Sequence, residues 1–132
     1  MSGARPDAGP PGPVDYDWAV LRAVPDVCAA AFVPLGVVLH ARRAGALHLR
    51  LAEAPVPGLD PDLLARAREG LRRIAEGDIG AGPVALLPPS ERFHWLVAVR
   101  SAAVQSSPVH TGRATDLDAA LERIFRRAVR AS

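Results

Sequence analysis

The chain has 132 residues, a length that fits one domain large enough to bury a hydrophobic core without disulfides or bound metal. Hydrophobic residues make up 49% of it, yet no window holds the roughly 20 uninterrupted apolar residues that a membrane-spanning helix needs. Sixteen basic residues are interspersed with 14 acidic ones for a net charge of +2, which argues against a nucleic-acid-binding protein with a concentrated basic surface.

The first 14 residues are predicted to form a disordered tail. They contain four Pro and three Gly, show no apolar periodicity and lack the apolar core of a signal peptide. We therefore expect a cytoplasmic protein with a single domain over residues 15–132. The domain begins with a predicted strand, in which Tyr16, Trp18 and Val20 share one face and which ends at Pro25.

Residues 32–42 and 46–53 predict a β-hairpin around a turn at residues 43–45, where Gly45 can adopt a positive φ. Alternation along the two arms places six apolar side chains on one face: Leu35, Val37, Leu39, Leu47, Leu49 and Leu51. The opposite face is then expected to carry the four cationic or titratable side chains of the hairpin, His40, Arg42, His48 and Arg50.

Two amphipathic helices are predicted in the second half of the chain. The first follows Asp60 and Pro61 and ends near Gly77, and the second follows Asp116. Between them, residues 93–99 alternate like a strand, with Phe93 and Trp95 on the core face. This order predicts an α+β fold in which a mainly antiparallel sheet of four to five strands packs both helices on one face.

If the apolar row of the strand at residues 93–99 meets the helices, His94 and Arg100 join the polar side of the hairpin. The outer face of the sheet would then be cationic. Such a face is either the ordinary solvated side of an antiparallel sheet or a surface for an anion or an acidic partner segment, since Arg offers paired donors to carboxylate and phosphate.

Residues 100–112 are dense in hydrogen-bonding side chains around Pro108 and before Gly112, which is typical of a binding loop and also of a structural one. The candidate ligand- or partner-binding residues of this region are His94, Arg100, Ser101, Gln105, Ser107, His110 and Thr111. A Ser–His catalytic pair is a third interpretation, but spacing alone does not identify one, so the catalytic residues remain unknown. The single Cys28 and the scattered His residues match no metal motif, and no metal or cofactor is expected.

Several blocks of the chain resemble the small bacterial family known as domain of unknown function 3037. They are "YDWAVLR", "GVVLHAR", "LPPSERFHWLVAVRS", "VQSSPVHTG" and "DLDAALERIF", which occur in order between about Tyr16 and Val129. The chain departs from the usual family pattern at Val99, where typical members have Pro, and at Pro34, where they have Asn. Members are often encoded beside a HipA-like serine/threonine kinase, so the resemblance implies an accessory protein and assigns no catalytic residue.

Two functions remain open from the sequence. The first is a regulatory, protein-binding module that acts with a HipA-like kinase and is not itself an enzyme. The alternative is a small enzyme or binder for an anionic metabolite, with Arg100 as the anion clamp and His110 or His94 as the acid or base. Neither reading involves a membrane, and nucleic acid is not an expected partner.

Overall fold

The computed structural model describes residues 12–24, 32–78, 80, 82–98 and 104–130, with only the backbone of the last residue. In chain order the elements are β1 (Val14–Ala23), β2 (Val33–Ala41), β3 (Ala46–Leu51), α1 (Pro61–Glu76), η2 (Pro83–Leu86), α2 (Pro89–Val97), β4 (Val104–Ser106), β5 (His110–Ala114), α3 (Leu117–Phe125) and η3 (Arg126–Arg130), a π-helical continuation of α3. The α+β class and the five-stranded antiparallel sheet are confirmed. The predicted N-terminal tail lies largely outside the described residues, as does Cys28.

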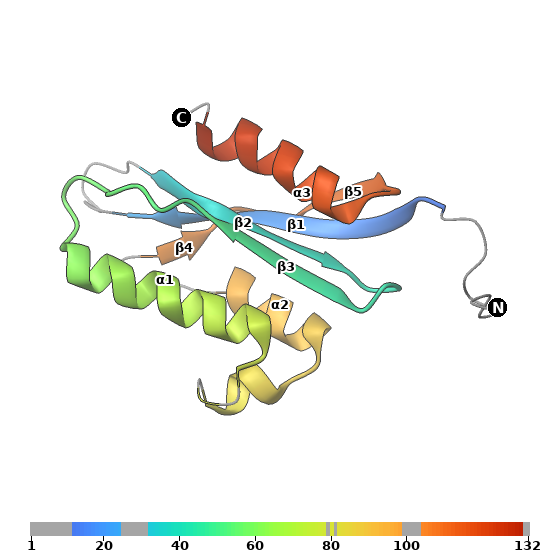
Figure 1. The fold of residues 1–132 in the computed structure, drawn as a ribbon, viewed down its shortest axis with the longest axis horizontal. Helices are drawn as coiled ribbons and strands as arrows, with labels where there is room; N and C mark the ends of the chain where they lie inside the picture. Colours follow the sequence, from blue (N-terminus) through green and yellow to red (C-terminus); the bar gives the residue numbers. More distant parts are fainter. Residues whose placement is uncertain (1–11, 25–31, 79, 81, 99–103, 131–132) are drawn as a thin grey trace.

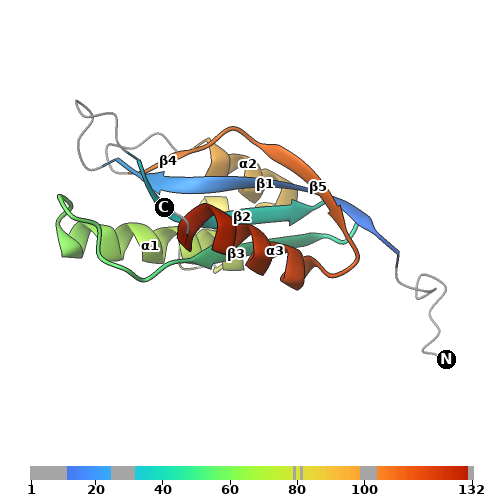
Figure 2. The same cartoon turned by 90° about the horizontal axis from the view of Figure 1, so that it is seen from above.

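The sheet has the order β3-β2-β1-β4, and β5 also pairs with β1. Strands β4 and β5 lie end to end along one side of β1: β4 pairs with its C-terminal end at Leu21–Ala23, and β5 pairs with its N-terminal end at Val14–Trp18 (Figure 2). The backbone of Ser107 bonds the Val20 carbonyl between these two ladders, at 2.8 Å. The long strand β1 therefore forms the centre of the sheet, and β2, β4 and β5 all pair with it.

Helices cover both faces of the sheet, which corrects the expectation that two helices share one face. Figure 1 shows α1 and α2 below the sheet and α3 above it. Two buried clusters match these two layers: one contains Leu64 and Leu71 of α1 with Phe93 of α2, and the other contains Leu121 and Ile124 of α3. Both faces of the described sheet thus pack against helices, in contrast to the solvated outer face that the sequence suggested.

The segment predicted as a strand at residues 93–99 is helix α2, as far as Val97. Pro89 occupies the first turn, where its missing N–H costs no hydrogen bond. Phe93 and Leu96, three residues apart, are the buried positions, whereas Trp95 is 54% exposed. An alternating apolar pattern is compatible with a strand or with a helix. In the observed helix, the three-residue spacing determines which apolar side chains reach the core.

The β2–β3 turn contains four residues and not three, because Ala41 pairs with Ala46. His48 consequently lies opposite Leu39, and Arg50 lies opposite Val37. A register shift of one residue moves every side chain of a strand to the other face of its sheet. The predicted grouping of the apolar residues of the two arms on one face is therefore wrong.

Candidate functional site

The predicted cationic face of the hairpin is not formed. His40 is 5% exposed on the α2 side of the sheet, where its ring stacks on Phe93 with centroids 5.4 Å apart. Arg50 lies on the α3 side, with its Nε donating to Glu122 at 3.0 Å and its guanidinium 4.2 Å from the ring centre of Phe125. The prediction that His40, Arg42, His48 and Arg50 share one face is wrong, since the register places His40 and Arg50 on opposite faces.

The hydrogen-bonding residues of the predicted loop do not form one cluster. Arg100 and Ser101 lie outside the described residues. Gln105 is half-buried in β4 opposite Arg22 of β1. Ser107 is 6% exposed, its Oγ accepting the Val20 N–H at 2.9 Å and donating to the Pro108 carbonyl at 2.8 Å. Ser107 thus serves the backbone of the sheet at the break between β4 and β5.

The two candidate histidines of this region belong to different layers of the molecule. His94 is exposed on α2, below the sheet. His110 begins β5, where it pairs with Trp18, and the two rings lie 4.6 Å apart. Trp18 packs against the cluster of α3, so His110 lies on the α3 side, while the neighbouring Thr111 is exposed opposite Asp17. A single pocket containing both histidines does not exist among the described residues, and the binding role of each one stays a prediction.

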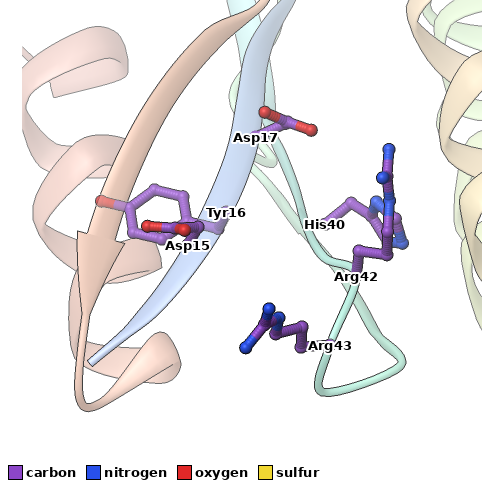
Figure 3. A pocket seen from close by; sticks show the side chains of 6 residues that line it. All are labelled: Asp15, Tyr16, Asp17, His40, Arg42 and Arg43. Atoms are coloured by element: carbon purple, nitrogen blue, oxygen red, sulfur yellow. The ribbon is translucent and has the colours of Figure 1, made fainter. Parts of the chain in front are cut away.

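A polar pocket of about 270 Å³ lies at one end of the sheet (Figure 3). Pairing between β1 and β2 ends at Asp17 and His40, whereas β1 continues beside β5. The strands therefore part, and the turn after β2 supplies the other wall. Six residues line the pocket: Asp15, Tyr16, Asp17, His40, Arg42 and Arg43.

The side chains of this pocket carry balanced charge. Figure 3 shows Arg43 reaching from the turn toward the gap, while the ring of Tyr16 points away toward the neighbouring strand. Asp15 also pairs with Arg113, whose Nε lies 3.3 Å from a carboxylate oxygen. Two carboxylates, two guanidiniums and the His40 imidazole thus line the same pocket, an arrangement that suits the binding of a small polar group.

Burial lowers the pKa of His40 below its ordinary value of 6.5, and the nearby Arg42 and His94 lower it further. Only the facing carboxylate of Asp17 opposes this shift. The His40 imidazole is therefore neutral at pH 7. Its stacking on Phe93 and its 5% exposure keep most of the ring away from anything bound in the pocket.

The lining of the polar pocket consists of carboxylate, phenol, imidazole and guanidinium groups. No Ser, Thr or Cys lines the polar pocket, and no three His, Cys, Asp or Glu residues among those described are grouped to hold a metal ion.

A second concavity, of about 470 Å³, runs along strand β3, and we call it the β3-edge groove. Its floor includes Leu47 and Leu49, which pack partly into the core. Its lining from β3, the turn and the helices is Gly45, Leu47, His48, Leu49, Arg72, Ala75, Glu76, Pro89 and Arg92. Sequence reasoning missed this site, because it joins a strand to two helices that lie 20 to 45 residues further along the chain.

Strand β3 forms an open edge of the described sheet, since β2 is its only partner strand there. The Ala52 N–H donates to the Leu35 carbonyl at 2.7 Å, which identifies the residues of β3 that bond β2. Because inward and outward backbone groups alternate in an antiparallel pair, the N–H and C=O of Leu47 and Leu49 point outward. The groove therefore combines free backbone donors and acceptors with an apolar floor.

The helices of the described residues include none that is long and apolar enough to cross a membrane. In comparisons with known proteins, no curated protein and no solved structure gave a significant match. The family model described as "Protein of unknown function (DUF3037)" matches residues 18–129. This match runs from within β1 through the other strands and through α1, α2 and α3, so the chain belongs to the DUF3037 family.

Proposed function

We propose that this protein is a non-enzymatic protein-binding module that pairs an extended segment of its partner with strand β3. The carrying observation is the β3-edge groove, where the outward backbone groups of Leu47 and Leu49 lie beside an apolar floor. A strand added to a sheet edge gains backbone hydrogen bonds, while pockets for its alternate side chains provide selectivity.

Strand β3 lacks two of the devices that usually protect an edge, a bulge and a proline, although it carries the charged Arg50. Its register with β2 is continuous from Ala46 to Leu51, without a bulge, and it contains no proline. Natural proteins block such edges with bulges, prolines or inward charges, because an open edge pairs with other chains. An edge without a bulge or a proline that lies in a concave groove supports the proposal that a partner covers it.

The helices beside the groove offer side chains for recognition. Ala75 and Pro89 extend the apolar surface, and Arg72, Glu76 and Arg92 supply charge at its margin. Trp95 lies three residues after Arg92 and hence on the same side of α2, and it is 54% exposed. Tryptophan is among the residues that contribute most to protein interfaces, so we assign Trp95 as an anchor beside the groove.

For the partner we propose a HipA-like serine/threonine kinase in the bacterial cytoplasm, which the family resemblance implied. Calorimetric titration of the kinase of the source organism into Leu47→Pro and Leu47→Ala tests both statements. The two variants lose the same leucine side chain, but only proline removes the outward N–H. We expect binding about tenfold or more weaker for Leu47→Pro than for Leu47→Ala, the effect of losing a hydrogen bond in a buried ladder.

A second comparison uses exposed side chains, whose removal leaves the fold intact. Trp95→Ala should weaken the complex, whereas Val109→Ala, at the other edge of the sheet, should not. Equal binding of the two Leu47 variants would exclude pairing at β3. A kinase that associates in no nucleotide state would exclude that partner, and a wild-type dimer that Leu47→Pro dissociates would identify a second copy of this chain as the occupant.

The polar pocket supports a second candidate function, the binding of a small anionic metabolite. Its carrying observation is Arg43, which reaches from the turn toward the gap, with Arg42 and His40 in the same lining. Arg43 is the anion clamp of this second candidate, whereas Arg100, the clamp expected from the sequence, lies outside the described residues and stays a prediction. Binding of a dicarboxylate or a phosphate ester that is lost in Arg43→Gln and retained in Arg66→Gln, an exposed arginine elsewhere, would support it; equal affinities would refute it.

A further inference from the structure

Arg68 of α1 is a buried arginine with too few hydrogen-bond partners. Its side chain is 9% exposed, and one terminal nitrogen, Nη2, donates to the Ala54 carbonyl. Its Nε is shielded from water and has no acceptor among the described residues. None of the ion pairs within the described part of the chain includes Arg68.

Two arginines nearby show how the same fold satisfies a guanidinium elsewhere. Arg92 donates to the carbonyls of Leu87, Ile74 and Ala75 at 2.7 to 3.1 Å. Arg72, one turn after Arg68 on α1, pairs with carboxylates of Glu53 and Glu69. Among the described residues, Arg68 has neither a carboxylate nor a set of carbonyls, in contrast to Arg72 on the same helix.

A buried guanidinium without a counter-charge raises the free energy of the folded state, and loss of a proton cannot relieve this cost. Arginine stays protonated at every pH at which a protein is folded, so burial does not make it neutral. A buried donor without an acceptor loses its hydration and gains nothing in return. An anion bound beside Arg68 would supply the hydrogen-bond acceptor and the negative charge that the described residues do not provide.

Arg68 lines a cavity of about 350 Å³ that is otherwise apolar. Val33 and Pro34 of β2, Ala52 and Val56 of the β3–α1 connection, and Val129 of η3 form much of the wall. Figure 1 shows this connection passing the end of the molecule at which β2 begins and the C-terminal helix ends. The volume falls in the range of roughly 300–1,000 Å³ that is usual for small-molecule pockets.

We propose that this cavity binds a small aliphatic monocarboxylic acid, with its carboxylate on the Arg68 guanidinium and its carbon chain against the apolar wall. One guanidinium balances one negative charge, which favours a carboxylate over a phosphate with its additional oxygens and charge. The apolar lining favours a hydrocarbon chain over a sugar or a second acid group. The site is separate from the β3-edge groove and does not depend on the function proposed above.

The test uses octanoate, 1-octanol and acetate as probes of the full chain, followed by calorimetry and by the unfolding temperature. Arg68→Met removes the charge while nearly keeping the volume, and Arg66→Met is the matched control, an exposed arginine on the same helix. Octanoate should bind the wild type and Arg66→Met and raise their unfolding temperatures. Its affinity for Arg68→Met should fall about tenfold or more, as expected for a lost charge-assisted hydrogen bond.

The unfolding temperature of unliganded Arg68→Met checks the fold, and it should equal or exceed that of the wild type because an unpaired buried charge has been removed. Failure of octanoate to bind the wild type, or equal octanoate binding by Arg68→Met, would overturn the proposal. Equal binding of 1-octanol would show that the charge plays no part. Tighter binding of an apolar tetrapeptide that requires its free C-terminal carboxylate would replace the small acid by the end of a protein chain.

Discussion

Replacing Ser107 by alanine separates a structural role from a binding role for a buried residue of the predicted loop. In the wild type the Ser107 Oγ accepts the Val20 N–H at 2.9 Å and donates to the Pro108 carbonyl at 2.8 Å. The hydroxyl thus takes the place of the backbone acceptor that is missing where β4 gives way to β5. Alanine keeps the backbone bond from Ser107 to Val20 and removes the hydroxyl together with its two hydrogen bonds.

The expected cost of Ser107→Ala follows from the two bonds that it breaks. The Val20 N–H lies in the middle of the central strand, and a buried donor left without an acceptor costs about 1–3 kcal/mol. The Pro108 carbonyl belongs to an exposed residue, where water can replace the hydroxyl, so it adds little. We expect the free energy of unfolding to decrease by about 1–3 kcal/mol.

Urea unfolding followed by circular dichroism measures this change, with Ser106→Ala as the matched control. Ser106 also donates to a carbonyl, that of Ser107 at 2.7 Å, but it is half-exposed and should cost less than about 1 kcal/mol. Faster hydrogen exchange of the Val20 amide in Ser107→Ala would locate the effect. If Ser107→Ala is as stable as the wild type but loses partner or ligand binding, the structural assignment of Ser107 is wrong.

Three further predictions concern packing and charge. Gly112→Ala should destabilise the protein by about 1–3 kcal/mol, since the added Cβ would lie 2.4 Å from the ring of Tyr16, and Tyr16→Ala should largely remove that cost in a double-mutant cycle. Gly70→Ala, where nothing lies within 4 Å, should instead stabilise α1 by about 0.5–1 kcal/mol in the same urea assay; destabilisation there would contradict the open surface. The pKa of His40 is lowered in the folded state, so the unfolded chain binds a proton at this residue more readily. The contribution of His40 to the free energy of unfolding should be fully present above pH 6.5 and decrease as the pH falls from 6.5 toward the folded-state pKa. His40→Asn should abolish that part of the pH dependence of unfolding, and equal slopes for variant and wild type would refute it.

The sequence alone identified the elements whose local signals agree with their tertiary surroundings. Helix α1 runs from Pro61 to Glu76, with the Asp60 side chain accepting the Asp62 N–H and Gly77 at φ 72, as the capping pattern predicted. The strands β1, β2 and β3 and the helix after Asp116 were likewise predicted close to their observed positions. These elements combine a clear apolar period with clear end signals, so each one is specified within a short window of residues.

The conformation of residues 89–97 and the faces of the hairpin depended on more distant information. Phe93 and Trp95 alternate as in a strand. Only the packing of Phe93 and Leu96 under the sheet shows that this segment follows the helical period. The faces of β3 depended on whether three or four residues form the turn before it, a choice that Gly45 permits in either case. A shift of one residue in the β2–β3 register separates the predicted cationic face from the observed arrangement. In the observed arrangement His40 is buried on one face and Arg50 is ion-paired on the other.

Composition, length and periodicity by themselves determined that this is an α+β domain, and the residue blocks along the chain were enough to indicate the DUF3037 family. Tertiary structure alone decided which groups meet: His40 with Asp17, Leu47 and Leu49 with α1 and α2, and Arg68 with an apolar cavity. The physical reason is the distance along the sequence over which each signal acts. Caps and amphipathic periods act over a few neighbouring residues, whereas an open strand edge or an unpaired buried charge exists only after distant segments have packed.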